Sequence, residues 1–247
     1  MTTLFFEIFN SELPRQGPGD TISTLRALAL VPGLGPTARV LDIGCGTGPQ
    51  TIALAQNSAA HIVAVDTHEP FVNALNQQAR LLGIAHRVEA HLRDMRQLDY
   101  PPGSFDLIWC EGAIYIMGFE AALSDWRKLL SPGGHIVVSE VCWTQPNPPP
   151  ECAAFWTAEY PAIRDVPEML KTIERCRYNV MDHFTLPATS WWDDFYKPLQ
   201  ESVTIFRERH REEADAQQVA DQIQREIDMW HAYGDFYSYE FFAMRLR

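Results

Sequence analysis

The residues best suited to chemistry lie in one glycine-rich segment, Leu41-Asp-Ile-Gly-Cys-Gly-Thr-Gly48. Gly44, Gly46 and Gly48 remove side chains where a short apolar run gives way to a sequence compatible with a helix. A ligand can therefore approach the backbone N–H groups at the start of that helix. The segment predicts a site for a flat, polar ligand. Taken alone, a tight turn that serves only helix packing explains the three glycines equally well.

An acid at the end of the next apolar run supports the ligand interpretation. Asp66 closes the run His61-Ile-Val-Ala-Val-Asp66. It lies about 20 residues after the glycine turn, where an acid can bind both hydroxyls of a ribose. A negative charge is also favoured at the start of the following helix, which offers a second explanation of this acid. We expect Asp66 to bind a ribose.

Alternating strand and helix patterns must position this turn. Apolar runs predict strands over residues 39–43, 61–66, 87–92, 104–110 and 135–141. Helical spacing predicts helices over 49–57, 71–82 and 119–130. Repeated strand–helix units of this length imply an α/β fold, with a doubly wound, mostly parallel sheet and helices on both of its faces.

The pattern changes after residue 142. The proline-rich segment 144–150 predicts a linker or hinge, and helical patterns dominate beyond it. A helix is expected over 165–176, a strand over 178–186, a helix start at Ser190 and another helix around 219–230. We predict a single domain of 247 residues. It would comprise an N-terminal lid segment (1–36), a cofactor-binding core (37–142), helical decoration that contains strand six (143–235) and a final strand (236–247).

Composition excludes several classes of protein. A net charge of −12 disfavours nucleic acid as a partner, because such affinity comes mainly from basic side chains. No apolar run reaches the roughly 20 residues that span a bilayer, so no membrane association is expected. The start of the chain does not resemble a signal peptide, which predicts a cytoplasmic protein. Neither the five cysteines nor the eight histidines show a metal-ligand spacing, and we predict no metal.

The glycine segment resembles motif I of the class I S-adenosylmethionine-dependent methyltransferases. The resemblance is to the small-molecule branch that includes the ubiquinone/menaquinone-biosynthesis and glycine- or sarcosine-type enzymes. Three further segments are similar to motifs of this family in the same order, and the resemblance covers residues 37–142. They are Arg93-Asp-Met-Arg-Gln-Leu98, Phe105-Asp-Leu-Ile-Trp-Cys-Glu-Gly112 and Leu129-Leu-Ser-Pro-Gly-Gly-His-Ile136.

The resemblance implies a fold and a cofactor. The sheet should have seven strands in the order 3-2-1-4-5-7-6, with the last strand antiparallel. The cofactor would be S-adenosylmethionine, with S-adenosylhomocysteine as product and no metal. Asp94 would bind the adenine amino group and the Met95 backbone would meet the ring. The full set of expected cofactor contacts is Gln16, Asp42, Gly44, Cys45, Gly46, Gly48, Asp66, Thr67, Asp94, Met95 and Glu111.

Residues for the methyl acceptor are less well defined by this pattern. Glu111 follows the fourth strand directly, and Tyr115 is the candidate on the acceptor side, although a packing role explains that tyrosine too. Glu140 and His135 are alternative general bases, if one is needed. Gln16 lies in a segment, 11–19, that resembles one found before motif I in some bacterial relatives. That segment would fold over the cofactor or form a plain surface loop.

The acceptor is expected to be a small molecule, enclosed by the N-terminal segment and the region after residue 150. The aromatic residues of these regions could instead form a homodimer interface. A noncatalytic module that binds S-adenosylmethionine remains an alternative function. A nicotinamide-dependent oxidoreductase is a weaker one, because its turn requires the spacing Gly-x-Gly-x-x-Gly, whereas Gly46 and Gly48 here are separated by one residue.

Overall fold

The computed structural model describes residues 3–247 and contains one mixed sheet. Its strands are β1 (Arg39–Ile43), β2 (His61–Asp66), β3 (Val88–Leu92), β4 (Phe105–Cys110), β5 (Leu130–Trp143), β6 (Arg164–Asp165), β7 (Tyr178–Thr185) and β8 (Tyr237–Leu246). They lie in the order β3-β2-β1-β4-β5-β8-β7, and β8 is antiparallel to both of its neighbours. This confirms the predicted order and the antiparallel last strand. The two-residue strand β6, which pairs with the end of β5, was not predicted because it is too short to show a period.

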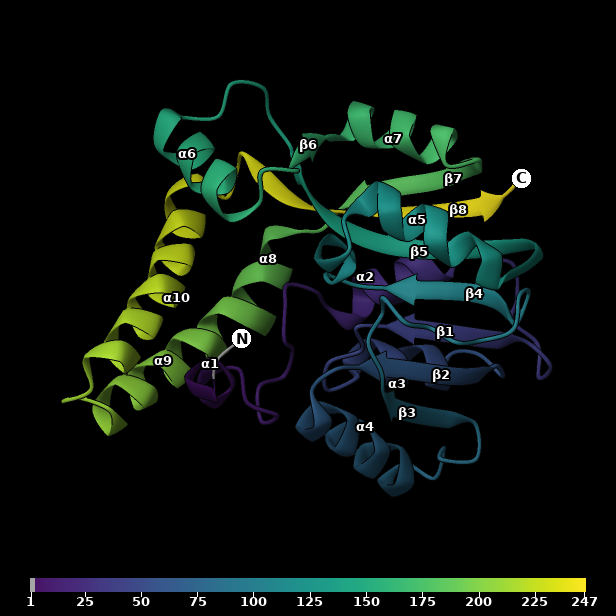
Figure 1. Cartoon of the computed structure of the whole chain (residues 1–247), viewed down its shortest axis with the longest axis horizontal. Coiled ribbons are helices and arrows are strands. Elements are labelled where there is room, and N and C mark those ends of the chain that lie inside the picture. The colour runs from purple at the N-terminus through teal and green to yellow at the C-terminus, as the bar shows by residue number, and fades with distance from the viewer. Residues whose placement is uncertain (1–2) are drawn as a thin grey trace.

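Helices cover both faces of the sheet (Figure 1). They are α1 (Thr3–Ile8), α2 (Thr21–Leu28), α3 (Pro49–Gln56), α4 (Glu69–Leu81), α5 (Phe119–Trp126), α6 (Pro150–Glu159), α7 (Val166–Arg175), α8 (Ala188–Trp191), α9 (Lys197–Arg209) and α10 (Ala214–Tyr233), with short 3-10 turns η1 (Ile114–Ile116) and η2 (Arg127–Leu129) and the π-helical η3 (Trp192–Tyr196). Among residues 3–247, no helix is long and apolar enough to cross a membrane.

The buried strands are apolar on both sides because each side meets a layer of helices. In β4, Leu107 and Trp109 belong to the core under α2 and α3. Ile108 and Cys110 belong to the core under α5 and α7. Successive side chains of a strand point to opposite faces, so a strand covered on both faces shows a continuous apolar run rather than alternation.

A second group of helices lies beyond the carboxyl ends of the parallel strands (Figure 1). It contains α6, α8, α9 and α10, and α1 packs against α9 and α10. The Ser202 hydroxyl donates to the Ile8 carbonyl at 2.8 Å, and His210 Nε2 lies 2.9 Å from a carboxylate oxygen of Glu7. The start of the chain is thereby held over the edge of the sheet where a ligand site is expected.

Two predicted boundaries are wrong. The helix predicted over 119–130 gives way to η2 at Arg127, and Leu130 begins β5, where it pairs with Phe105. Leu130 continued the helical spacing by chance, since a buried strand start is apolar as well. Ser190 does not start a helix: it lies within α8, and its hydroxyl hydrogen-bonds Asp20 across the structure. A tertiary contact therefore uses the hydroxyl that the pattern assigned to a helix cap.

Gly48 tests how tightly the glycine turn packs. Its φ is +86°, and a Cβ atom there would lie 2.3 Å from Leu75 of α4, whereas Gly83 has a φ of +70° and nothing within 4 Å. We expect Gly48→Ala to lower the free energy of unfolding by about 2–4 kcal/mol, and the control Gly83→Ala by only about 1–2 kcal/mol. Denaturant unfolding measures both changes. Equal losses would show that Leu75 does not restrict this position.

Candidate functional site

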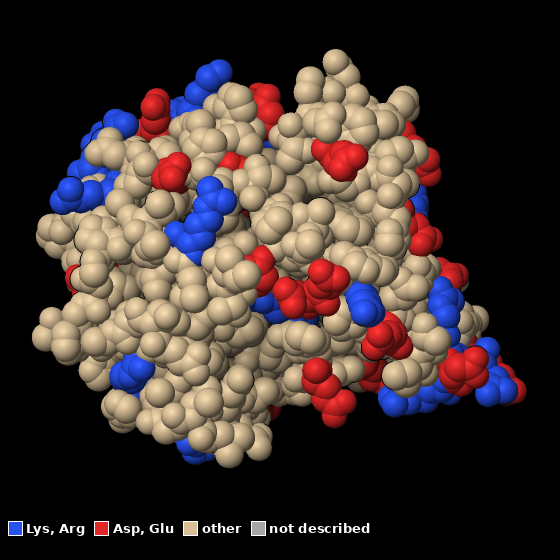
Figure 2. Space-filling model, turned by 180° about the vertical axis from the view of Figure 1, so that it is seen from behind, with Lys and Arg blue, Asp and Glu red and all other residues tan. Residues whose placement is uncertain are grey.

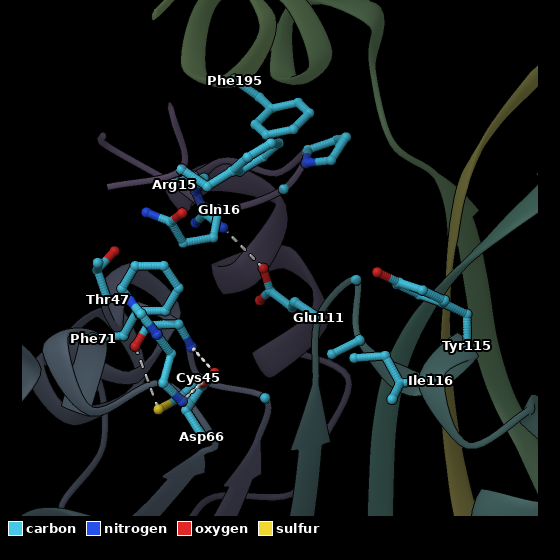
Figure 3. A pocket seen from close by; sticks show the side chains of 18 of the residues that line it. Arg15, Gln16, Cys45, Thr47, Asp66, Phe71, Glu111, Tyr115, Ile116 and Phe195 are labelled. Carbon is cyan, nitrogen blue, oxygen red and sulfur yellow. Dashed lines mark hydrogen bonds and ion pairs between the residues drawn. The ribbon is translucent and has the colours of Figure 1, made fainter. Parts of the chain in front are cut away.

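A cavity of about 390 Å³ opens at the carboxyl ends of the parallel strands. It lies next to the ends of β1 and β4, on either side of the point where the strand order reverses. Ligands of open α/β sheets bind in this position. Figure 3 shows the glycine turn and Asp66 at one end of the cavity, Tyr115 at the other, and Arg15 and Gln16 between them and Phe195.

The glycine turn serves packing and ligand access at different positions. Gly44, Cys45 and Gly46 line the cavity, but Gly48 does not. A Cβ atom at Gly46 would point toward the side chain of Gln16, whose Cγ would be 3.2 Å away. Packing therefore accounts for Gly48, whereas Gly46 lines the cavity and its role in ligand access stays a prediction.

Asp66 connects the ends of β1 and β2 and faces the cavity. Its Oδ2 accepts a hydrogen bond from the Gly46 N–H at 2.9 Å, and its Oδ1 accepts one from the His68 N–H at 2.9 Å. His68 is the N-cap residue of α4. The carboxylate thus organises the turn and the helix start, and each oxygen retains a lone pair for a ligand donor.

Asp42 lies beneath the turn and is fully buried. Its Oδ2 accepts from the Thr51 hydroxyl at 2.5 Å and from Gln50 Nε2 at 3.3 Å, whereas Oδ1 has no partner among residues 3–247. Burial raises the pKa of this carboxyl to about 7, and Glu111 and Asp66 act in the same direction. Hydrogen bonds from Thr51 and Gln50 only partly offset this effect on the pKa.

The expected cofactor contacts divide into two groups. Those that line the cavity are Gln16, Gly44, Cys45, Gly46, Asp66, Thr67, Met95 and Glu111. Asp42, Gly48 and Asp94 do not line it. Asp94 accepts a hydrogen bond from the Arg96 N–H at 2.9 Å, which forms a local turn after β3. The role of each of these residues toward a cofactor stays a prediction.

Glu111 is the centre of a buried polar cluster at the end of β4. Its side chain is only 4% exposed, and Oε2 lies 3.1 Å from Arg15 Nη1. Its Oε1 accepts from the Thr24 hydroxyl at 2.7 Å and from Trp109 Nε1 at 2.9 Å. Three donors thus occupy the carboxylate, and the N-terminal segment is tied to the sheet through it. Sequence reasoning named the segment 11–19 and its Gln16 but did not single out Arg15.

Gln16 places an unsatisfied oxygen at the cavity. Its Nε2 donates to the Asn10 carbonyl at 3.0 Å, but its Oε1 is buried without a partner among residues 3–247. A buried acceptor without a hydrogen bond costs free energy, so this oxygen can stabilise a ligand that brings a donor.

The far end of the cavity has aromatic walls. Tyr115 lies on η1, its ring centroid 6.0 Å from that of Tyr160. It also lines a second cavity, of about 200 Å³, which shares Trp156, Glu226 and Tyr239 with the first. The alternative bases lie elsewhere: Glu140 and His135 line neither cavity, although burial raises the pKa of Glu140 to about 8 and lowers that of His135.

Glu226 was missed by sequence reasoning. The Tyr196 hydroxyl donates to its Oε1 at 2.9 Å, and burial raises the pKa of its carboxyl. The sequence alone could have indicated Glu226, because this acid lies three residues after Ile223 and directly before Ile227, on the apolar side of α10. An acid on the apolar side of an amphipathic helix is worth examining as a functional residue.

No group of three or more histidine, cysteine, aspartate or glutamate side chains within residues 3–247 is arranged to hold a metal ion. Figure 2 shows that, on the face opposite to the view of Figure 1, acidic side chains gather near the middle and Lys and Arg form no continuous band.

The comparisons with known proteins identify the family. Residues 34–202 match the model of a methyltransferase domain, so the chain belongs to this methyltransferase family. It is 32% identical over 123 residues to phosphoethanolamine N-methyltransferase of Triticum aestivum, a match that covers 49% of this chain but only 24% of that enzyme. The match therefore spans only about a quarter of the length of that relative.

Solved structures share the fold along the whole chain. The structure of YjhP from E. coli has a TM-score of 0.85 at 20% identity, with 100% of both chains covered. A methyltransferase from Thiobacillus denitrificans, in complex with S-adenosyl-L-homocysteine, has a TM-score of 0.83 at 21% identity and covers 100% of this chain and 99% of its own.

The buried Asp42 predicts how stability depends on pH. Because its pKa is about 7 in the folded protein and 3.8 in a model compound, folding retains a proton that the unfolded chain releases. Stability from this group is therefore greatest below pH 4 and falls as the pH rises to about 7. We expect Asp42→Asn to raise the free energy of unfolding at pH 8 by about 1–3 kcal/mol, since one pKa unit corresponds to about 1.4 kcal/mol.

The gain should shrink toward pH 4, and the exposed control Asp99→Asn should show no comparable gain. Urea unfolding at pH 4, 6 and 8 measures the effect. An Asp42→Asn variant that is less stable than the wild type at pH 8 would mean that the ionised carboxylate is needed in the folded state.

Proposed function

We propose that this chain transfers a methyl group from S-adenosylmethionine to a small-molecule acceptor. One observation carries the proposal. A single cavity is lined by the glycine turn and by an acid at the next strand end, and it shares four residues with a chamber that has aromatic walls. Such a cavity has room for a polar donor at one end and for an acceptor at the other. The fold and the family support the same reaction.

The residues present fit the proposed cofactor. Asp66 offers carboxylate oxygens to a ribose, and Gly46, whose N–H donates to Asp66, brings no side chain into the cavity that it lines. The unpartnered Oε1 of Gln16 can accept from the α-amino group of the methionine part. When bound, S-adenosylmethionine would supply an electrophilic methyl group on a positively charged sulfur. The relative from Thiobacillus denitrificans binds the demethylated product of this cofactor.

The remaining task of the chain is to position the acceptor and exclude water. Holding two reactants in line can supply on the order of 7–11 kcal/mol of the barrier reduction in favourable cases. The Arg15–Glu111 ion pair holds the N-terminal segment over the cavity, and Phe9 and Phe195 pack together at 6.3 Å between ring centroids. We assign Glu111 to positioning, because its oxygens are already occupied, and Tyr115 to contact with the acceptor.

A small acceptor agrees with the size and charge of the site. The wheat relative is named for a small phosphorylated amine, and the acceptor end of the cavity is a chamber of about 200 Å³. The net charge of −12 disfavours a nucleic-acid acceptor. Turnover against a panel of small acceptors would separate an enzyme from a noncatalytic module that binds the same cofactor.

Asp66 provides the direct test of the cofactor site. We expect Asp66→Asn to weaken binding of S-adenosylhomocysteine by about 10-fold to 150-fold, because hydrogen bonds to a charged group contribute about 1.5–3 kcal/mol. Calorimetric titration measures the affinity, and thermal unfolding checks that the variant folds. Asp99→Asn, at an exposed position after β3, is the matched control and should bind normally. Unchanged affinity in a folded Asp66→Asn variant would remove Asp66 from the site.

The Arg15–Glu111 pair tests the role of the N-terminal segment. Removing one partner of a buried ion pair costs about 3–5 kcal/mol, because the other charge stays buried. We expect Arg15→Gln to release the segment. Thermolysin should then cleave near Phe5 and Phe9 at least tenfold faster, and S-adenosylhomocysteine should bind more weakly. The exposed control Arg80→Gln should change neither property. Cleavage and affinity both at wild-type level would show that the segment does not depend on this pair.

A further inference from the structure

The acceptor end of the site combines aromatic rings with carboxylates. The smaller cavity, here called the acceptor chamber, is lined by five aromatic side chains, one valine and the two acids Glu159 and Glu226. Trp156 packs edge to face against Tyr237, at 4.8 Å between ring centroids, which fixes its orientation. The chamber shares Tyr115, Trp156, Glu226 and Tyr239 with the larger cavity, so a molecule bound there can reach toward the cofactor end.

No positive side chain lines the acceptor chamber within residues 3–247, although Arg225 lies beside it, 5.9 Å from the centre of the Phe155 ring. The residues that line the acceptor chamber include no lysine, arginine or histidine among those the structure describes. In the larger cavity, Arg15 is neutralised by Glu111 at 3.1 Å. Arg93 lies after β3 with its guanidinium 5.2 Å from the centre of the Tyr100 ring. The charged side chains that line the acceptor end are therefore acids.

Glu226 presents a free oxygen to this chamber. Its Oε1 accepts from the Tyr196 hydroxyl at 2.9 Å, and its Oε2 has no hydrogen-bond partner among residues 3–247. A carboxylate with an open oxygen on the wall of a cavity has a lone pair to offer to a ligand donor. Removing it from water is costly, and a ligand cation would offset that cost.

A second carboxylate lies directly behind the wall. Glu140 is 1% exposed, and neither of its oxygens has a hydrogen bond of normal geometry within residues 3–247. The Tyr160 side chain is the group that most favours the ionised form of Glu140. Burial raises the pKa of Tyr115, and Glu226 and then Glu140 add to this effect. Both tyrosines line the chamber. Because burial raises the pKa of Glu140 to about 8, this group is mostly protonated at neutral pH, and Glu226 and Glu159 are the acids that can carry charge in the chamber.

We propose that the acceptor is an amine that enters the chamber as a cation, held by the Glu226 carboxylate and by the aromatic faces around it. Cations bind over the faces of tryptophan and tyrosine, and the attraction grows when both are removed from water. A phosphate or carboxylate group would meet only like charges in the chamber. This inference rests on the proposed function, and it assigns a charge and a chemical class to the acceptor.

The reaction balances for a primary or secondary amine. The bound ammonium first gives a proton to the Glu226 carboxylate, which leaves a lone pair on nitrogen. That pair forms the new N–C bond while the C–S bond of the methyl donor breaks and its electrons stay on sulfur. The products are a protonated, N-methylated amine and a neutral thioether. The Glu226 carboxyl passes its proton to water when the chamber opens, and no oxidant or metal takes part.

Two probes of equal shape test the charge preference. Choline carries a quaternary ammonium, and 3,3-dimethyl-1-butanol has carbon in place of that nitrogen and is neutral. In the presence of saturating S-adenosylhomocysteine, titration followed by tryptophan fluorescence and calorimetry gives both dissociation constants. We expect choline to bind the full-length protein at least tenfold more tightly than the alcohol. We expect Glu226→Gln, which can still accept from Tyr196, to reduce this ratio to below threefold.

Controls keep this test separate from the test of the cofactor. Glu201→Gln, an exposed position on α9, should leave the ratio unchanged, and each variant should bind S-adenosylhomocysteine like the wild type. If S-adenosylhomocysteine binds but choline and the alcohol bind equally, the cationic acceptor is ruled out while the proposed function stands. A ratio that Glu226→Gln leaves unchanged would also overturn the assignment. Failure of S-adenosylhomocysteine to bind the wild type would overturn the proposed function itself.

Discussion

The buried carboxylate of Glu111 is the constraint on which the rest of the site depends. A carboxylate that is 4% exposed at the end of a central strand must find its donors inside the protein. Arg15 and Thr24, from the N-terminal segment and α2, supply two of them. These contacts hold the N-terminal segment, which is distant in sequence, against the sheet. They place Gln16 over Gly46, and the segment forms part of the wall of the cavity at the strand ends.

The two ends of this cavity have different chemistry. At one end, Asp66 makes the surface polar, and its carboxylate already accepts hydrogen bonds from the N–H groups of Gly46 and His68. At the other end, rings of tyrosine and tryptophan surround acids that lack a positive partner among the described residues of the chamber. A donor that carries ribose and amino groups suits the first end, and a cationic acceptor suits the second. The Arg15–Glu111 pair lies between them and contributes no net charge to either.

The sequence predicted the sheet well, because a parallel sheet covered on both faces requires continuous apolar runs that stand out from the helices between them. The glycine turn and Asp66 were equally visible, since each is a residue type at a fixed spacing. Arg15, Trp156 and Glu226 were not predicted as a group. They come from three distant segments, and only tertiary packing brings them to one cavity. Leu130 and Ser190 show the opposite error, in which a local pattern was overridden by strand pairing and by a distant hydrogen bond.

Transfer of a labelled methyl group would show whether the cavity catalyses methyl transfer. The purified protein is incubated with S-adenosylmethionine that carries a deuterated methyl group, together with a mixed pool of small amines, alcohols and acids. Mass spectrometry then follows the label. We expect S-adenosylhomocysteine and an amine that carries the intact deuterated methyl group to form in equal amounts. Labelled alcohols or acids with no labelled amine would contradict the assigned acceptor, and the absence of any labelled product would contradict the proposed methyl transfer itself.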